Sequence, residues 1–290
     1  MTGPIEEHVL TEYQALLAGR GCVDLASWTQ LEFSGSDRLT FVHNLCTNDI
    51  KSLSTGETRE AFITNVHGKT IGHGWFHSRP DSLILTTAPR QADVLINHFE
   101  KYRIREKVTI VDQTSVWSRW LVTGELPDEI SEFTFPWHDV AAHVLTGPAG
   151  RSVIGGKQEC SMSAFEIARV EARLPVFGID ITDANLPQEL NRNEQAINFT
   201  KGCYLGQETV ARLDALGHVN RTLCLLQLEK GIEPQAGMTL EADGKVVATV
   251  TSATWSPKFA STIAMAYVRR GHNTPGQVIE SATGNATVLA

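Results

Sequence analysis

The segment Lys201-Gly202-Cys203-Tyr204-Leu205-Gly206-Gln207-Glu208 places a thiol between two glycines and two positions after a lysine. Glycine permits backbone conformations and close approaches that a side chain would block. Residues 208–213 are predicted to form a helix, so the Cys203 thiol would lie between a cation and a helix N-terminus. Both influences favour the thiolate by lowering the thiol pKa. A buried cysteine in a glycine-rich loop fits the same residues, and these local features leave both interpretations open.

The other cysteines argue against a disulfide framework. The chain has five cysteines, an odd number, and they contain no C-x-x-C pair. This is a poor pattern for paired disulfides and a poor ligand set for structural zinc or an iron–sulfur cluster. We therefore expect three or all four of the remaining thiols to be small buried hydrophobic side chains. They are Cys22, Cys46, Cys160 and Cys224.

Composition narrows the class of protein further. The 290 residues are 42% hydrophobic and 20% charged, as in ordinary globular proteins, and the net charge is −8. A negative chain argues against a nucleic-acid surface, and Glu106 interrupts the one basic run, Arg103, Arg105 and Lys107. No segment approaches the roughly 20 apolar residues of a spanning helix. Residues 1–7 do not resemble a secretory signal, so the expected location is the cytoplasm.

The first three quarters of the chain mix helical and extended patterns. Helices are expected at 5–17, after a Ser36 or Asp37 cap, from Pro89, and from a capping box at Ser163 to a point before Pro175. Strands are expected at 23–33, 60–64, 71–76, 83–87 and 108–112, with a turn at 66–69. The last part changes to short β-like runs at 224–228, 245–255, 263–268 and 277–279, separated by glycines. That texture predicts a small all-β domain, a barrel or a sandwich.

The octapeptide resembles a specific family signature. It is similar to K-G-C-Y-x-G-Q-E of the YgfZ-type folate-binding proteins at all seven defined positions, and Val210-Ala211-Arg212 continues the match. Three further segments resemble the broader glycine-cleavage T-protein (aminomethyltransferase) superfamily. They are GSDRLTFVHNLCTNDI at 35–50, the strand–turn–strand pattern at 60–76, and the segment from Arg169 to Ile181. The resemblance thus extends over the whole chain.

This resemblance implies a fold and a cofactor. The expected architecture is a multi-domain α+β, aminomethyltransferase-like fold, with antiparallel sheets and helices around a central channel. Residues 1–216 would form two intertwined subdomains, and residues 217–290 a C-terminal β-barrel domain. The channel would bind tetrahydrofolate or a one-carbon derivative. Glu171 would face the pterin, because a buried carboxylate can accept paired N–H bonds, and Arg192 would meet the carboxylates of the folate tail.

The resemblance also implies a function. YgfZ-type proteins act on iron–sulfur client enzymes, including some that modify tRNA, so Cys203 is expected to be the reactive group. The other signature positions are Lys201, Gly202, Tyr204, Gly206, Gln207 and Glu208. No direct nucleic-acid or membrane partner is expected. Because transient contact with a cluster needs one thiolate whereas resident clusters take about four, a chaperone-like maturation factor is favoured over a stored cluster.

Two alternatives stay open. An aminomethyltransferase or methyltransferase would use the same scaffold, but His73 stands where T-proteins have a carboxylate, and they lack the octapeptide. Imidazole can perform acid–base chemistry without supplying the same negative charge. A non-catalytic folate-binding module would make Cys203 structural. His73 and His77 share one strand face, but no carboxylate or cysteine occurs at matching spacing, so no metal site is predicted.

Overall fold

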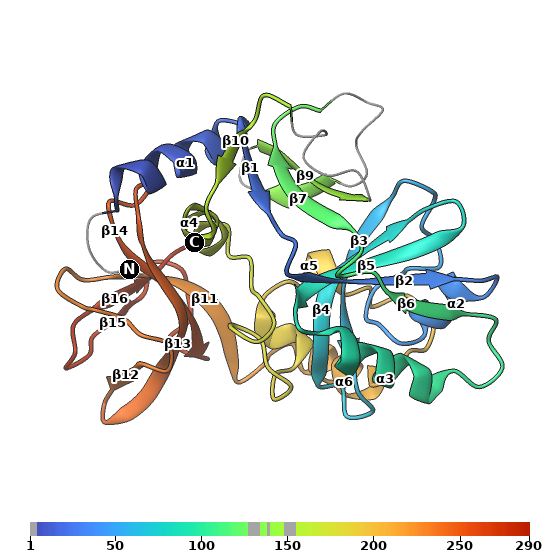
Figure 1. The fold of residues 1–290 in the computed structure, drawn as a ribbon. Coiled ribbons are helices and arrows are strands. Elements are labelled where there is room, and N and C mark those ends of the chain that lie inside the picture. Colours follow the sequence, from blue (N-terminus) through green and yellow to red (C-terminus); the bar gives the residue numbers. More distant parts are fainter. Residues whose placement is uncertain (1–4, 127–133, 138–139, 148–154) are drawn as a thin grey trace.

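The computed structural model describes residues 5–126, 134–137, 140–147 and 155–290, which form three sheets and the helices that pack on them (Figure 1). The first sheet is antiparallel throughout. Its strands, in spatial order, are β3 (Thr58–Thr64), β4 (Thr70–Ser78), β5 (Ser82–Pro89), β2 (Trp28–Ser34) and β6 (Thr109–Asp112). One face is apolar and packs with α2 (Arg38–His43) and α3 (Ala92–Tyr102) into a single core cluster.

The other face of the first sheet is buried although it carries polar side chains. In the β3–β4 register Glu60 pairs with Trp75 and Phe62 pairs with His73. Because side chains alternate along a strand, these four residues share one face. Glu60 and His73 are only 6% and 3% exposed. A strand face that is both polar and buried requires specific partners, since an unpaired buried polar group is costly.

The second sheet combines one strand from near the N-terminus with four strands from residues 118–160. Its spatial order is β10 (Gln158–Cys160), β1 (Gly21–Asp24), β7 (Ser118–Thr123), β9 (Val140–Gly147) and β8 (Thr134–Trp137). The β1–β10 pair is parallel and the other pairs are antiparallel. Helices α1 (Glu7–Leu17) and α4 (Met162–Glu171) pack on it through a core cluster that contains Leu16, Val23 and Phe165. Residues 25–27 carry the chain directly into the first sheet.

The C-terminal strands form a nearly closed barrel. Their order is β12 (Thr239–Ala242), β13 (Lys245–Ser256), β14 (Ser261–Arg269), β11 (Arg221–Leu228), β16 (Ala286–Val288) and β15 (Val278–Ile279). The edge strands β12 and β15 contact each other, which brings the two ends of the sheet together. The connecting element η2 (Pro187–Leu190) contacts β11 of the barrel as well as α5 (Asn193–Ala196) and α6 (Gln207–Leu216), and α5 contacts β3 of the first sheet. Figure 1 shows α6 beside α3.

The expected α+β class, with antiparallel sheets and a C-terminal β-barrel, is confirmed, whereas several local signals were misassigned. Ser161, not Ser163, caps α4, and its Oγ accepts from the Ala164 N–H at 3.3 Å. Pro89 ends β5 rather than starting a helix. Asp37 precedes α2 without capping it, because its carboxylate accepts the Lys107 N–H at 2.7 Å instead.

Strand boundaries also differed from expectation. The extended run at 23–33 is two strands in two different sheets, and the short barrel strands β12 and β16 were not predicted. Such short strands carry little periodic signal, so tertiary pairing decides them. The proposed division between residues 216 and 217 stays a prediction.

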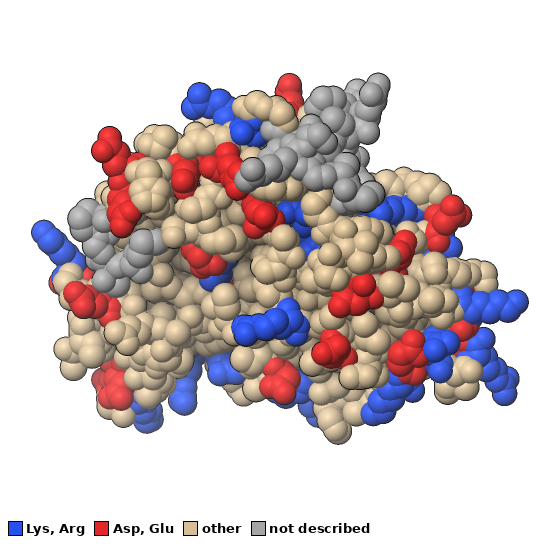
Figure 2. Space-filling view, in the orientation of Figure 1, with Lys and Arg blue, Asp and Glu red and all other residues tan. Residues whose placement is uncertain are grey.

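The surface carries both signs of charge. Acidic and basic side chains are interspersed over the face seen in Figure 2. The basic run of the sequence is a solvated loop, in which Arg103 pairs with Glu100 at 2.5 Å. Among the described residues, the helices are too short or too polar to cross a bilayer.

Candidate functional site

A charged cluster occupies the buried polar face of the first sheet. The Arg192 guanidinium donates to both carboxylate oxygens of Glu60, with Nη2 2.6 Å from Oε2. His73 Nε2 lies 2.7 Å from Glu60 Oε1. Burial alone would raise the pKa of Glu60, but the bonds from Arg192 and His73 outweigh it and lower the pKa to about 2. An ionised carboxylate only accepts, so Nε2 of His73 carries the proton in this pair.

A row of rings leads from this cluster towards α4. The His73 ring stacks on Phe62, with 4.9 Å between centroids, and meets Trp75 edge-on at 5.4 Å. Trp28 follows, 6.3 Å from Trp75 and 6.2 Å from Phe165 of α4. These separations are those of interacting aromatic pairs. The row therefore joins the charged cluster to the helix that also bears Glu171.

A cavity of about 530 Å³ opens beside the cluster. Glu60 and Trp75 contribute to its lining, together with Asn48, Thr58, Arg59, Glu194, Gln195 and Asn198. Amide and carboxylate groups set against one indole surface suit a flat molecule with several N–H groups. The volume falls in the range of small-molecule sites, about 300–1,000 Å³. We call this space the Glu60 cavity.

Lys201 anchors the octapeptide to a segment that includes Asn48, one of the residues lining this cavity. Its buried ammonium donates to the carbonyls of His43, Cys46 and Asn48, at 2.5, 2.9 and 2.7 Å. These carbonyls belong to the C-terminal end of α2 and the turn after it, where a cation is stabilised. Burial lowers the pKa of Lys201. The lysine therefore acts as an anchor, and the expected pairing of its charge with the Cys203 thiol is replaced by these three bonds.

Two glycines lock the octapeptide onto the β3–β4 hairpin. Gly206 has a φ of +79°, and a β-carbon there would lie 2.3 Å from the Asn65 carbonyl oxygen and 2.8 Å from the Gly68 Cα. Gly68 has a φ of +73°, and its β-carbon would lie 2.9 Å from the Gly206 carbonyl oxygen. Neither position accepts a side chain without strain. The turn and the octapeptide therefore fit together only because both lack a β-carbon.

Cys203 is exposed, whereas Cys22, Cys46 and Cys160 are buried and Cys224 is half-buried. The prediction that the other thiols pack mostly as hydrophobic side chains is confirmed. Beside Cys203, a β-carbon on Gly202 would meet no atom within 4 Å. The fold thus explains Gly206 but not Gly202. A missing side chain at position 202 keeps the neighbourhood of the exposed thiol open.

The remaining signature residues shape the loop and the helix that follows. Tyr204 is buried, and the Lys201 ammonium lies 4.9 Å from its ring centroid. Gly206 is the N-terminal boundary residue of α6, which Gln207 and Glu208 begin. The predicted helix after the octapeptide is therefore present and extends to Leu216.

Glu171 lies at the end of α4 in a second cluster. Tyr13 donates to its Oε2 at 2.7 Å, and Ser256 of the barrel donates to its Oε1. Burial raises the pKa of the Tyr13 hydroxyl, and the hydrogen bond to the Glu171 carboxylate raises it further, so the hydroxyl stays a donor. The carboxylate is 6% exposed and retains further lone pairs. Its predicted pterin contact stays a prediction. His73 and Arg192 meet at the Glu60 carboxylate, whereas Glu171 lies in this separate cluster.

The same segment ties α4 to the barrel. The buried Arg169 guanidinium contacts Glu166 at 2.7 Å, Asp180 at 2.9 Å and the Ser252 hydroxyl at 2.9 Å. Asp180 also accepts bonds from Thr251 and Ser252 of β13, at 2.6 and 2.5 Å. Two residues of the recognised segment from Arg169 to Ile181 thus have a structural role.

Glu60 is the functional candidate that the sequence did not bring forward. A signal was present, because pairing the two predicted strands around the turn at 66–69 places positions 60 and 73 on one face. His77, on the same face, lies 2.9 Å from the Thr58 hydroxyl. Within the described ranges, no group of three His, Cys, Asp or Glu side chains has the arrangement of a metal site.

Comparisons with known proteins agree with this architecture. Residues 3–143 match the model of the GCVT N-terminal domain, and residues 221–290 match that of the glycine cleavage T-protein C-terminal barrel domain. An aminomethyltransferase of Symbiobacterium thermophilum is 22% identical over 94% of this chain and 84% of its own length. A chloroplastic protein of Arabidopsis thaliana is 25% identical over 86% of this chain, and that match spans 65% of the plant protein, less than two thirds of its length.

A solved structure shows the fold. The glycine cleavage system aminomethyltransferase T of Bartonella henselae is 17% identical and superposes with a TM-score of 0.81 over 100% of this chain and 90% of that chain. The fold is therefore aminomethyltransferase-like. The two domain models, which together match most of the chain, place it in the glycine cleavage T-protein superfamily.

Proposed function

We propose that this protein is a YgfZ-type folate-binding protein that assists the assembly or repair of iron–sulfur clusters in client enzymes, including tRNA-modifying ones. The observation that carries the proposal is the exposed Cys203, held in an octapeptide that Lys201 and Gly206 fix to the fold. A single accessible thiol on a rigid loop suits transient contact with a client better than storage of a cluster, which takes about four thiolates.

Tetrahydrofolate, or a one-carbon derivative of it, fits the residues between the two buried clusters. In this proposal the Glu171 carboxylate accepts pterin N–H bonds with its remaining lone pairs, and Trp75, which lines the Glu60 cavity, offers a flat apolar surface. The amides of the Glu60 cavity would hold the more polar part of the molecule. Arg192 already pairs with Glu60, so we assign it first to orienting that carboxylate and second to the folate tail. Bound tetrahydrofolate supplies a carrier for one-carbon units.

Complementation tests the role of Cys203. A strain that lacks its own YgfZ-type protein would receive the wild type, Cys203→Ala or Cys224→Ala, with an iron–sulfur-dependent tRNA modification as the readout. We expect Cys203→Ala to lose the modification and Cys224→Ala, the matched half-buried thiol, to retain it. Equal modification by the wild type and Cys203→Ala would exclude a reactive role for this thiol.

Calorimetry tests the cofactor separately. Tetrahydrofolate is expected to bind the wild type, and Glu171→Ala is expected to bind it about tenfold or more weakly, because a charge-assisted hydrogen bond is lost. Tyr13→Phe is the control, since it removes a partner of Glu171 but keeps the carboxylate. If tetrahydrofolate does not bind the wild type, the folate part of the proposal fails even if complementation succeeds.

One observation favours a second candidate, a folate-dependent aminomethyltransferase. His73 stands where T-proteins have a carboxylate, but Glu60 brings a carboxylate to within 2.7 Å of it from the neighbouring strand. The negative charge of such a site is therefore present, although Arg192 neutralises it. Turnover of an aminomethyl donor with tetrahydrofolate separates the two functions. Strong turnover that survives Cys203→Ala and is lost in Glu60→Gln would favour the transferase.

A further inference from the structure

A second cavity, of about 670 Å³, lies where the barrel meets the first sheet. Its charged lining consists of Lys69, Glu189, Arg221, Arg269 and Arg270. Four cations thus face one carboxylate, in a chain whose acidic residues outnumber its basic ones by 33 to 25. Val246, Val247 and Ala248 of β13 add apolar surface to its lining. We call this space the basic cavity.

The one carboxylate of the basic cavity is already neutralised. Glu189 is 3.2 Å from the Arg221 guanidinium and accepts from the Asn185 amide at 3.0 Å. Arg221 is further fixed over the Tyr267 ring, 4.7 Å from its centroid. Lys69 donates to the Ala184 carbonyl at 2.6 Å, which positions its ammonium without removing its charge. The net charge of the basic cavity is therefore positive, and Lys69 and Arg221 are held in place by these contacts.

Arg269 and Arg270 supply the unpaired part of that charge. Both are exposed, and neither has an ion-pair partner among the residues described. Adjacent guanidinium groups offer planar N–H forks that match carboxylate and phosphate oxygens. Partial shielding by the cavity walls strengthens such contacts relative to open solvent.

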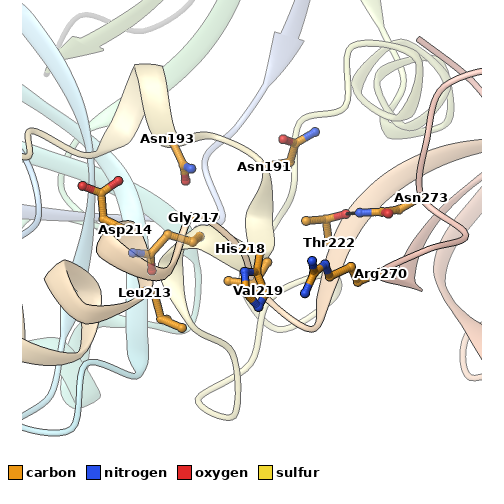
Figure 3. Close-up of a pocket in the computed structure, with 11 residues that line it drawn as sticks. Asn191, Asn193, Leu213, Asp214, Gly217, His218, Val219, Thr222, Arg270 and Asn273 are labelled. Atoms are coloured by element: carbon orange, nitrogen blue, oxygen red, sulfur yellow. Dashed lines mark hydrogen bonds between the residues drawn. The ribbon is translucent and has the colours of Figure 1, made fainter.

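A smaller cavity of about 370 Å³ adjoins the basic cavity and shares Arg270 with it (Figure 3). Arg270 and Thr222 lie on one side of it, and Asp214 and Asn193 lie on the other. Gln188 also lines it and is 6% exposed. Its amide nitrogen must face the Val210 carbonyl, 2.7 Å away, so its oxygen is an acceptor, and that oxygen has no partner among the described residues. The smaller cavity therefore offers acceptors, among them the Gln188 Oε1 and the Asp214 carboxylate, for ligand N–H or O–H groups.

We propose that the basic cavity binds a small oxoanion with at least two negative charges, either a phosphate ester or a polycarboxylate. The anionic end contacts Arg269, Arg270 and Lys69, and a polar end with N–H or O–H groups reaches the smaller cavity past Arg270. The site does not involve Cys203 or Glu171, so it stands independently of the folate proposal.

Isothermal titration at low ionic strength, with inorganic pyrophosphate and with citrate as probes, tests the site. We expect at least one probe to bind the wild type, and the tighter one identifies the phosphate or the polycarboxylate class. R269Q/R270Q is expected to bind about tenfold or more weakly, because charge-assisted hydrogen bonds are lost. Added salt should weaken binding by screening. K69Q, a single change on the opposite wall, should weaken it in the same direction.

The matched control is R105Q/K107Q, which removes two neighbouring exposed cations from the distant 103–107 loop and changes net charge equally. It is expected to bind as the wild type does. Failure of both probes to bind the wild type would overturn the proposal. Wild-type affinity in R269Q/R270Q would also overturn it, because the probe would then bind elsewhere. An equal loss of affinity in R105Q/K107Q would overturn it as well, because binding would then follow net charge alone.

Discussion

Lys201 places all three N–H groups of its ammonium on main-chain carbonyls. The sequence suggests Lys201 as a chemical partner of the thiol. In the structure it instead links the octapeptide to the C-terminal end of α2. Its buried charge is stabilised by these three oxygens and by the Tyr204 ring, so an apolar side chain of similar size cannot replace it.

Lys201→Met is expected to destabilise the fold. The change removes three charge-assisted bonds and leaves buried carbonyls without donors, at a cost of about 2–3 kcal/mol. Urea denaturation followed by circular dichroism measures it. Cys203→Ala is the control and should unfold like the wild type, because the thiol is exposed. Unchanged stability in Lys201→Met would contradict the anchoring role.

Glu60 should make stability depend on pH in the acid range. Its pKa of about 2 in the folded state lies below the ordinary 4.5, so its contribution is fully present above pH 4.5 and is lost as the pH falls towards 2. The loss is on the order of 3 kcal/mol. Glu60→Gln removes this contribution, so the difference in unfolding free energy between the two proteins should shrink between pH 5 and pH 2. A difference that stays constant would argue against an ionised Glu60.

At the scale of elements, the octapeptide and the β3–β4 turn form one unit. Gly206 and Gly68 each occupy a left-handed conformation, and each fills the space where the other's β-carbon would lie. The conformation of the Cys203 loop is therefore fixed by its contact with the β3–β4 hairpin, which is far away in the sequence. Gly202 contributes nothing to this contact.

Replacing either octapeptide glycine by alanine should have a different effect on stability. Gly206→Ala is expected to cost about 2–4 kcal/mol, from the left-handed backbone and the overlap with Asn65 and Gly68. Gly202→Ala should leave stability unchanged, yet it places a methyl group beside the exposed thiol and should reduce complementation. Thermal unfolding and the tRNA-modification readout measure the two effects. Equal unfolding temperatures for the two variants would refute the proposed interlock.

The sequence predicted these elements better than their contacts. The hairpin, the helix after the octapeptide and the burial of most thiols all followed from local patterns and composition. Glu60 was missed because one glutamate in an apolar run also fits an exposed edge. Its two partners come from a different strand and from a distant loop, so only the folded chain shows that the carboxylate is buried.

At the scale of the whole molecule, Arg169 joins α4, the segment around Asp180 and the barrel. Here the resemblance correctly marked an important segment, but not which of its residues were structural. The basic cavity was beyond sequence analysis altogether. Its cations come from the turn before β4, the start of β11 and the end of β14 with the residue after it, whereas the single basic run in the sequence lies on a solvated loop.

Arg169→Met is expected to weaken the docking of the barrel. It leaves Asp180 buried without its cation, which costs about 3–5 kcal/mol. Arg169→Lys keeps the positive charge but loses the forked guanidinium donors, so its free energy of unfolding should lie between those of Arg169→Met and the wild type. Chemical denaturation measures both, and limited proteolysis of the segment around Asp180 should accelerate in the same order. Wild-type resistance in Arg169→Met would show that Arg169 is not needed to hold the barrel in place.

The interlock of Gly68 with Gly206 also sets an order of events during synthesis. The ribosome releases the β3–β4 hairpin long before residues 201–208 emerge, so the earlier segment serves as a template for the later one. When the octapeptide emerges, the hairpin surface against which Gly206 packs has therefore already been synthesised. The exposed Cys203 thiol therefore takes up its folded position only after all strands of the first sheet, the last of which ends at Asp112, have been synthesised.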